Sequence, residues 1–382
     1  MVGAQKSLVD KAKKLAGKTD KITEARALIS EALQEVTGTN EDAYAYYVAG
    51  NIEWDSYDKK LAMLQINPED PSISKDDMTD MLINGYNYYV KALPLDSLPN
   101  AKGEVKPKYS KDILSRINSH INDFYEAGAT RYNQQKYYPD AYEAFNLFAE
   151  KSQTPDTVRA MGYFYAGVCA YSAKHTEVAR KAFANAVEKG YNNPNGYIYQ
   201  VACIESKIAE DSTYSDAGKK EILDLSKKGY EKFGLTDPFF ISNIVDSYHQ
   251  SNNDAEAFRI IESAMAASSD NAMLYGLRGW LNSATGKDEA SIADYAKAVS
   301  TPGVNADIVY KAARKYYNYG TNLLGSLDPK DGDFATKKKE IKDKYYLPAM
   351  DMARKALELS DNATEKNRIN NLIGDIDYSL SL

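Results

Sequence analysis

Small and apolar residues recur along the chain at positions i, i+4 and i+7, with polar residues between them. The copy at Ala179, Phe183 and Ala186 is typical. Further copies lie at Ala25-Ile29-Ala32, Gly85-Tyr89-Ala92, Ala141-Phe145-Phe148, Ala257-Ile261-Ala264, Ser291-Tyr295-Ala298, Ala349-Ala353-Ala356 and, less regularly, Ser226-Tyr230-Phe233. Because this spacing follows one face of an α-helix, the chain is predicted to be a stack of similar helices.

A matching helix precedes these copies. Gly167 lies twelve residues before Ala179, and Gly279 lies twelve residues before Ser291. A small residue lets two helix backbones approach closely, so each such unit is predicted to be an antiparallel helix pair. The step from Val245 to Gly279 defines the repeat period of these units.

This pattern resembles the tetratricopeptide repeat (TPR), in which large, small, Ala, aromatic and Ala positions follow one another. The best-matching units are Tyr163-Gly167-Ala179-Phe183-Ala186 and Tyr275-Gly279-Ser291-Tyr295-Ala298. The unit between Tyr197 and Phe233 has lost most of the pattern, and Phe148 and Val245 replace small residues. The resemblance covers nearly the whole chain. It implies an all-α fold, an α-solenoid (TPR-like superhelix) of about eight antiparallel helix pairs with a C-terminal capping helix.

Proline-containing turns such as Asn193-Pro194 and Asp237-Pro238 separate the predicted helices, because the residue before proline disfavours the helical region. First helices are predicted near 4–16, 41–57, 110–135, 156–173, 195–210, 237–251, 271–284, 305–326 and 364–380. Second helices are predicted near 21–36, 76–93, 139–152, 176–189, 216–233, 254–268, 288–300 and 338–359.

Residues 94–109 form an irregular, proline-containing stretch between two predicted pairs. This predicts N-terminal TPR-like units in residues 1–93, an inter-unit loop or linker at 94–109, and a main TPR-like solenoid in residues 110–382. The alternative is an ordered surface loop within one continuous array.

Composition narrows the possible partners. No run approaches the 18 or more apolar residues of a membrane-spanning helix, and a formal charge of −7 with scattered lysines disfavours a nucleic-acid partner. No glycine-rich phosphate loop occurs, and the three histidines have no i, i+4 partner of the kind that binds zinc. We expect no enzyme activity, no metal and no cofactor.

Cys169 and Cys203 are one repeat period apart, which places them at similar heights on neighbouring first helices. Neighbouring helices lie about 8–10 Å apart, whereas a disulfide requires Cα atoms within roughly 7 Å. We expect both thiols to be free.

The start of the chain has the small-x-small form of a signal-peptide cleavage site at Val2 and Ala4. With its high content of Tyr, Asn, Asp and Lys, the chain resembles exported TPR proteins of the Bacteroidetes group. This predicts export to the periplasm or cell envelope with the signal peptide removed. The alternative is a cytoplasmic protein with an ordinary polar N-terminus.

In TPR proteins, first helices line a concave groove, and side chains three before, one after and four after the small residue are exposed there. Carried onto this sequence, the ligand-binding positions are Tyr47, Asn51, Trp54, Phe164, Tyr171, Tyr199, Asp246, His249, Trp280 and Tyr317. We expect a mainly neutral, aromatic wall on which Trp54 and Trp280 are the first candidates for contact with a ligand.

The expected function is that of a non-catalytic protein–protein interaction scaffold, which binds a peptide or partner protein in its concave groove. Tyrosine and tryptophan side chains also suit sugar rings. The alternative is therefore a glycan-binding component of an envelope uptake system that uses aromatic stacking.

Overall fold

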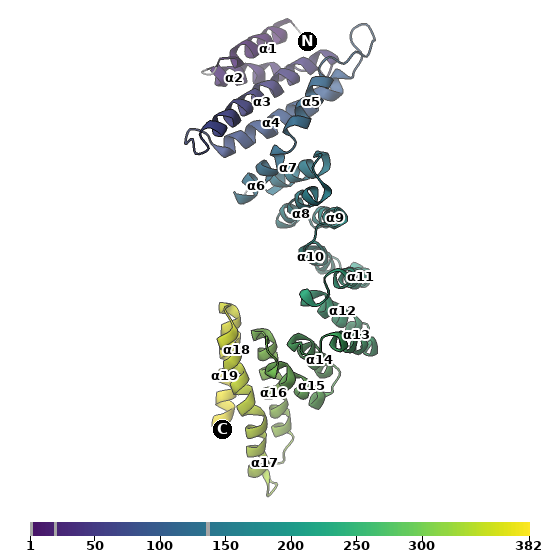
Figure 1. Cartoon of the computed structure of the whole chain (residues 1–382), viewed down its shortest axis with the longest axis vertical. Coiled ribbons are helices and arrows are strands. Elements are labelled where there is room, and N and C mark those ends of the chain that lie inside the picture. Colours follow the sequence, from purple (N-terminus) through teal and green to yellow (C-terminus); the bar gives the residue numbers. More distant parts are fainter. Residues whose placement is uncertain (1–2, 19–20, 135–137) are drawn as a thin grey trace. The chain divides into compact units, whose positions relative to one another are not determined.

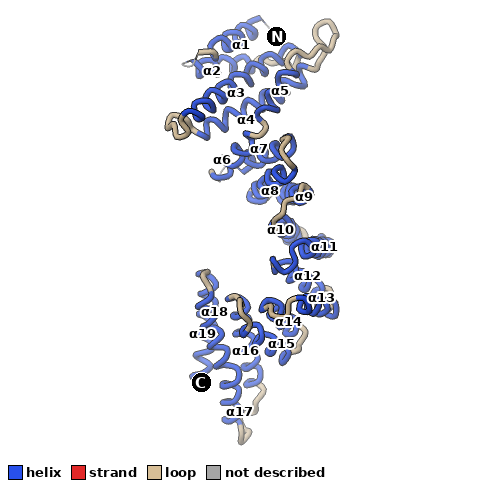
Figure 2. Tube along the Cα trace, in the orientation of Figure 1, coloured by secondary structure: helices blue, strands red, loops and turns tan. Residues whose placement is uncertain are grey.

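The computed structural model describes residues 3–18, 21–134 and 138–382, and in these residues helices alternate with short loops and no strand occurs (Figure 2). The predicted all-α fold is confirmed. The chain divides into two units, Met1–Ser212 and Thr213–Leu382. No helix in the described residues has the length and apolar character needed to span a membrane. Val2, on which the export prediction depends, lies outside the described residues.

The first unit is built from successive helix pairs (Figure 1). Its helices are α1 (Gly3–Ala16), α2 (Ile22–Leu33), α3 (Ala43–Ile66), α4 (Lys75–Asp96), α5 (Ser110–His120), α6 (Asp123–Asn133), α7 (Tyr138–Lys151), α8 (Asp156–Ser172), α9 (Thr176–Glu188) and α10 (Asn195–Glu210). Helices α1 and α2, α3 and α4, α6 and α7, and α8 and α9 pack against each other as predicted.

The second unit continues the same architecture. Its helices are α11 (Ser215–Phe233), α12 (Pro238–Gln250), α13 (Asp254–Ala267), α14 (Ala272–Ala284), α15 (Asp288–Ser300), α16 (Ala306–Gly325), α17 (Phe334–Ile341), α18 (Leu347–Leu359) and α19 (Ala363–Ser381). Helices α12 and α13, α14 and α15, and α16 and α18 form the predicted pairs, and α19 packs on α18 as the predicted final helix.

The small residues of the first helices lie against aromatic rings of the second helices. A Cβ atom added to Gly167 would lie 2.6 Å from the ring of Phe183, and one added to Gly279 would lie 3.2 Å from the ring of Tyr295. The first distance is too short for any larger residue, so Gly167 is required for this close approach. The pairing of small and aromatic positions predicted from the sequence spacing is therefore observed in the packing.

The prediction of one helix over 110–135 is wrong. The chain turns at Ile121 and Asn122, so that α5 and α6 are separate helices. Ile121 is buried in the turn. The break lets α5 contact α4 while α6 pairs with α7. The predicted end at residue 135 lies outside the described residues.

The predicted helix at 338–359 is divided as well. A π-helical segment at Lys342–Tyr346 joins α17 to α18. Tyr346 is buried there against Gly320 of α16, where an added Cβ would lie 2.9 Å from the ring. The wider turn of the backbone thus coincides with the packing of this ring on α16.

Residues 94–96 of the predicted 94–109 loop belong to α4, and the ordered loop that follows, residues 97–109, is tied down at both ends. The buried carboxylate of Asp96 accepts hydrogen bonds from the backbone N–H groups of Lys108 (2.9 Å), Tyr109 (2.9 Å) and Ser110 (2.8 Å). The side-chain amide of Asn40 donates to three backbone carbonyls, two in the last turn of α4 and one at the start of the loop. The bonds of Asp96 hold the backbone just before and at Ser110, and they therefore set where α5 begins.

The division of the chain differs from the boundary expected at 94–109. One apolar core includes side chains of α3, α4, α5, α6 and α7, so it continues across this loop within the first unit. The division falls between Ser212 and Thr213, inside the pair predicted at 195–210 and 216–233. This is the stretch where the sequence pattern is weakest.

The two cysteines are free, as predicted, and both are buried. Burial raises the pKa of the Cys169 thiol to about 12 and that of Cys203 to about 11.

Candidate ligand-binding groove

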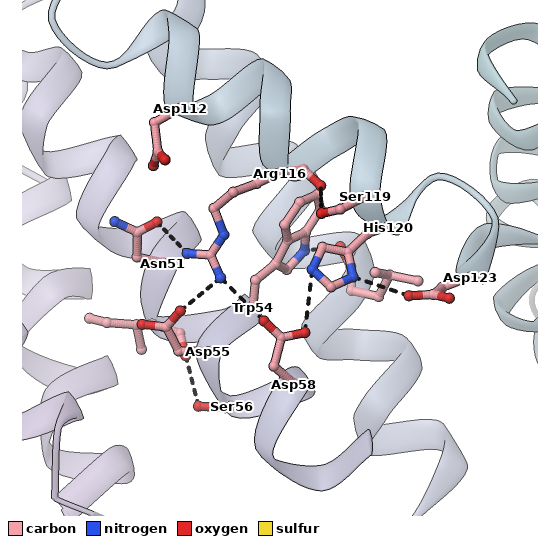
Figure 3. Close-up of polar contacts among 12 residues, drawn as sticks. Asn51, Trp54, Asp55, Ser56, Asp58, Asp112, Arg116, Ser119, His120 and Asp123 are labelled. Carbon is pink, nitrogen blue, oxygen red and sulfur yellow. Dashed lines mark hydrogen bonds and ion pairs between the residues drawn. The ribbon is translucent and has the colours of Figure 1, made fainter. Parts of the chain in front are cut away.

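Trp54 does not face a groove. Its side chain is 0% exposed, its Nε1–H donates to the carbonyl of Leu82 at 2.9 Å, and its ring meets those of Tyr89 and His120 edge-on. The prediction of a ligand contact at Trp54 is therefore wrong. The physical reason is that the indole packs on α4, where Gly85 leaves room for its ring, and that α5 adds His120 to the enclosure (Figure 3).

Tyr47 and Asn51, on the same face of α3, are also bound by α5. The hydroxyl of Tyr47 donates to Asp112 at 2.8 Å, and the amide oxygen of Asn51 accepts from Arg116 at 2.8 Å. The guanidinium of Arg116 extends further onto α3 and forms an ion pair with Asp55 at 2.7 Å (Figure 3). We call α5 the cover helix, because it makes these contacts with the predicted wall of the first unit.

The next predicted positions fill space between helices. Phe164 is buried and stacks on Tyr191 with ring centroids 4.3 Å apart, so its predicted place in the groove is wrong. Tyr199 stacks on Phe183 at 5.0 Å, and Tyr171 meets Tyr199 edge-on at 5.8 Å. Large rings at this level of the stack lie against one another.

Tyr317, on α16, is bound by the last helix of the chain. Its hydroxyl lies 2.9 Å from Oγ of Ser379 and 3.3 Å from the carbonyl oxygen of Asp375. Helix α19 therefore occupies this end of the wall, and the hydroxyl already has partners there.

Trp280, Asp246 and His249 lie together in the second unit. A cavity of about 530 Å³ between α12, α14 and α16 is lined by Trp280 and Asp246. The half-buried indole of Trp280 meets the ring of His249 edge-on at 5.5 Å, and His249 is in turn held by Asp254 at 2.6 Å. The structure therefore brings these three predicted residues together at an open site.

The cavity is lined by both apolar and polar side chains. Its apolar lining includes Phe239, Met273, Leu277 and Ile308. A second cavity of about 300 Å³ is lined by Trp280, Arg314, Lys315 and Asn318, among others. Because Trp280 lines both, the two cavities adjoin at its ring, and we call them together the Trp280 groove.

Arg314 is a residue of this groove that the sequence analysis missed. It follows Ala313, which lies one repeat period after Gly279, just as Gly279 lies one period after Val245. All three small or apolar residues are buried. The side chains that follow them, Asp246, Trp280 and Arg314, therefore occupy equivalent positions on α12, α14 and α16, and we call this set the groove rung.

The signal for Arg314 was present in the sequence. Helix α16 is long and holds two candidate small residues, Ala313 and Gly320, and the prediction counted from Gly320. Continuing the repeat period from Gly279 would have selected Ala313 and hence Arg314. With Lys311 and Lys315 nearby, the expectation of a mainly neutral wall is wrong for this part of the chain.

The charges of the groove differ in their partners. Lys311 pairs with Asp307 at 2.6 Å, and Lys315 pairs with Asp288 at 2.5 Å. Arg314 is exposed and has no ion pair or hydrogen bond within the described residues. Among those residues Asp246 has no cationic partner either, and its carboxylate accepts one hydrogen bond, from Gln250 at 2.5 Å. The groove rung thus presents an available anion and an available cation on either side of Trp280.

The phenol of Tyr295 lies beneath this surface. Burial raises the pKa of Tyr295 to about 12, so the phenol is neutral at physiological pH. The fixed charges that face the groove are therefore those of its carboxylates, lysines and arginine.

The fold and groove define an all-α protein of repeated helix pairs with one half-exposed tryptophan at an open site. Its small-residue and aromatic packing, as at Gly167 and Phe183, resembles that of tetratricopeptide repeats. No family model matches the chain. No curated protein matches it either.

Solved structures similar to this chain include TPR proteins. The C-terminal part of a TPR repeat-containing protein from Cytophaga hutchinsonii is 13% identical with a TM-score of 0.40, covering 76% of this chain and 97% of that one. A thermophilic TPR protein from Thermus thermophilus is 14% identical with a TM-score of 0.34, covering 52% and 99%. A TPR repeats protein from Bacteroides fragilis is 20% identical with a TM-score of 0.29, covering 68% and 98%. Likenesses of this size carry no information about function.

Proposed function

We propose that this chain is a non-catalytic interaction scaffold and that the Trp280 groove holds a peptide segment of a partner protein. The observation that carries the proposal is the setting of Trp280. Its ring is half-buried between two adjoining cavities, whereas Trp54 is fully enclosed.

The size and lining of the groove support a side-chain ligand. Ligand pockets commonly measure about 300–1,000 Å³ and combine an apolar floor with a few polar groups. The larger cavity, at about 530 Å³, fits this range, with Met273, Leu277 and Ile308 among its apolar lining and Asp246 among its polar lining. An apolar side chain of a partner would bury its surface against the indole ring.

Trp280 is the expected centre of the binding energy. Tryptophan is enriched among the few interface residues whose truncation costs about 2 kcal/mol or more. Its ring orientation is held by His249, which Asp254 fixes in place. A ring so placed loses little freedom on binding, which favours affinity.

The proposal is tested by affinity capture with the full chain as bait. Wild-type protein, Trp280→Ala and Phe258→Ala are immobilised, and the captured proteins from a lysate are compared by quantitative mass spectrometry. Phe258 is a matched control, because it is also a half-buried aromatic residue of the second unit and it lines neither cavity. We expect a partner that Trp280→Ala loses and Phe258→Ala retains. Equal capture by all three proteins would refute the assignment of the groove.

The glycan alternative gives a different result. On a glycan array, a sugar-binding groove would retain specific glycans in a Trp280-dependent manner. Such binding, together with no Trp280-dependent protein in the capture experiment, would replace the proposed peptide ligand by a sugar.

A further inference from the structure

The groove rung carries an inference that rests on the proposed function and states what kind of segment binds. We propose that the Trp280 groove selects an extended segment with a basic, an apolar and an acidic side chain, each about three residues from the next. The basic side chain meets Asp246, the apolar one packs on Trp280, and the acidic one pairs with Arg314.

The spacing follows from the repeat. Helix α14 contacts both α12 and α16, and packed helices lie about 8–10 Å apart. An extended polyproline-II segment advances about 3.1 Å per residue and completes a turn every three residues. Side chains three residues apart therefore point to the same side at about 9 Å separation, which matches the step between neighbouring positions of the groove rung.

The order of charges follows from the partners of the groove residues. Lys311 and Lys315 are already neutralised by Asp307 and Asp288. Asp246 and Arg314 have no opposite charge among the described residues, and they flank Trp280 at equivalent positions. A segment with complementary charges gains at both ends of the rung, whereas a like charge at either end is repelled.

The apolar position follows from the cavity. The side chains of Met273 and Leu277 of α14 and Ile308 of α16 line the same cavity as the indole of Trp280. A large apolar side chain would fill this space and displace water from it, which strengthens the neighbouring charge pairs.

The test uses three fluorescein-labelled peptides with a Gly-Ser background. The first carries Lys, Phe and Glu with two residues between each, the second carries Lys in place of Glu, and the third carries Glu in place of Lys. We expect wild-type protein to bind the first peptide about tenfold more tightly than either of the others, because each of those places a like charge against the rung.

Charge reversal in the protein should switch this preference. Arg314→Glu is expected to favour the peptide with two lysines by about tenfold over the first peptide. Arg354→Glu is the matched control, because Arg354 is also an exposed arginine of the second unit and lies in neither cavity. Its preference should equal that of wild type. Circular dichroism melts of both variants verify that the fold is retained.

The outcome separates this inference from the proposed function. Equal affinity for all three peptides, or no binding of any of them by a protein that still captures a Trp280-dependent partner, would overturn the charge pattern and leave the groove proposal standing. A switch in Arg314→Glu that Arg354→Glu does not share would support it.

Discussion

Trp54 and Trp280 are both predicted to face the groove from first helices, yet one is core and the other is surface. In the first unit, the cover helix brings His120 onto Trp54, Arg116 onto Asn51 and Asp112 onto Tyr47. In the second unit, the face that holds Trp280 keeps cavities of about 530 and 300 Å³. The repeat places a side chain on the wall, and the segments added to the repeat decide whether that wall is available to a ligand.

The difference begins with the loop that precedes the cover helix. Asp96 gathers three backbone N–H groups at the end of the loop, which positions the first turn of α5. Arg116 then pairs with Asp55 and Asp58 on α3. The charges on this wall are therefore paired with one another. Asp246 and Arg314, in contrast, form no ion pair with any of the described residues.

The largest expected effect is that of Trp54→Ala. Removing a fully buried tryptophan leaves a cavity and should lower the free energy of unfolding by about 3–5 kcal/mol. Urea denaturation followed by circular dichroism measures this. A change below about 1 kcal/mol, as typical of an exposed site, would show that Trp54 is not enclosed and would remove the contrast between the two walls.

Asp96→Asn should weaken the cover of the first wall. Hydrogen bonds to a charged acceptor contribute about 1.5–3 kcal/mol each when buried, and the amide cannot accept all the bonds of Asp96. We expect a loss of about 2 kcal/mol at pH 7, measured by urea denaturation. Asp76→Asn, at an exposed carboxylate of the same unit, is the control and should have a much smaller effect.

The Asp96 interaction also predicts a pH dependence. Burial by itself raises the pKa of Asp96, but the hydrogen bonds from Lys108, Ser110 and Tyr109 outweigh it and hold the pKa below its ordinary value. The contribution of this carboxylate is therefore complete above its unfolded-state pKa, about 3.9, and is lost as pH falls through its lower folded-state pKa. Wild type and Asp96→Asn should converge in stability on acidification, and an unchanged difference at low pH would contradict the prediction.

Trp280→Ala should reverse the pattern seen for Trp54. A half-buried ring gives up less apolar burial, so we expect a stability loss of about 1–2 kcal/mol but loss of the captured partner. The urea melt and the capture experiment together measure the two effects. A stability loss as large as that of Trp54→Ala, with capture unchanged, would place Trp280 in the core as well.

Fluorescence quenching is the smallest expected effect, but it compares the solvent exposure of the two tryptophan rings directly. The chain has two tryptophans, so Trp280→Phe leaves Trp54 as the sole indole, and Trp54→Phe leaves Trp280. Acrylamide should quench Trp280 strongly and Trp54 weakly, because quenching requires contact with the ring. Equal quenching constants in the two variants would contradict the structural difference.

The sequence spacing was sufficient to predict the helix pairs because each pair is a local feature. Gly167 and Phe183 are close in sequence and in space, and the repeat carries the same relation to Gly279 and Tyr295. The same repeat spacing predicts that Trp280 faces the groove, and in the structure its ring lines two cavities. These features depend on one helical face at a time, which a periodic pattern records.

The cover of the first wall could not be predicted in the same way. The break at Ile121 and Asn122 contains neither glycine nor proline, so nothing in the local pattern signals it. The contact of Arg116 with Asp55 joins residues 61 positions apart. Side chains such as Tyr47 and Asn51, which look exposed within one helix pair, gain partners when such a distant segment packs on them. Trp54 also has a local reason, because its indole lies against Gly85 and donates to Leu82 of α4, the second helix of its own pair.

The burial of the two thiols affects how the folded chain responds to oxidants. Cys169 and Cys203 are unbridged, and burial raises the pKa of both thiols well above neutrality. Because the thiolate is the form that reacts, the folded protein offers almost none of it to oxidants or to glutathione. Burial therefore protects both thiols of the folded protein from oxidation, and the chain reaches this fold without forming a disulfide.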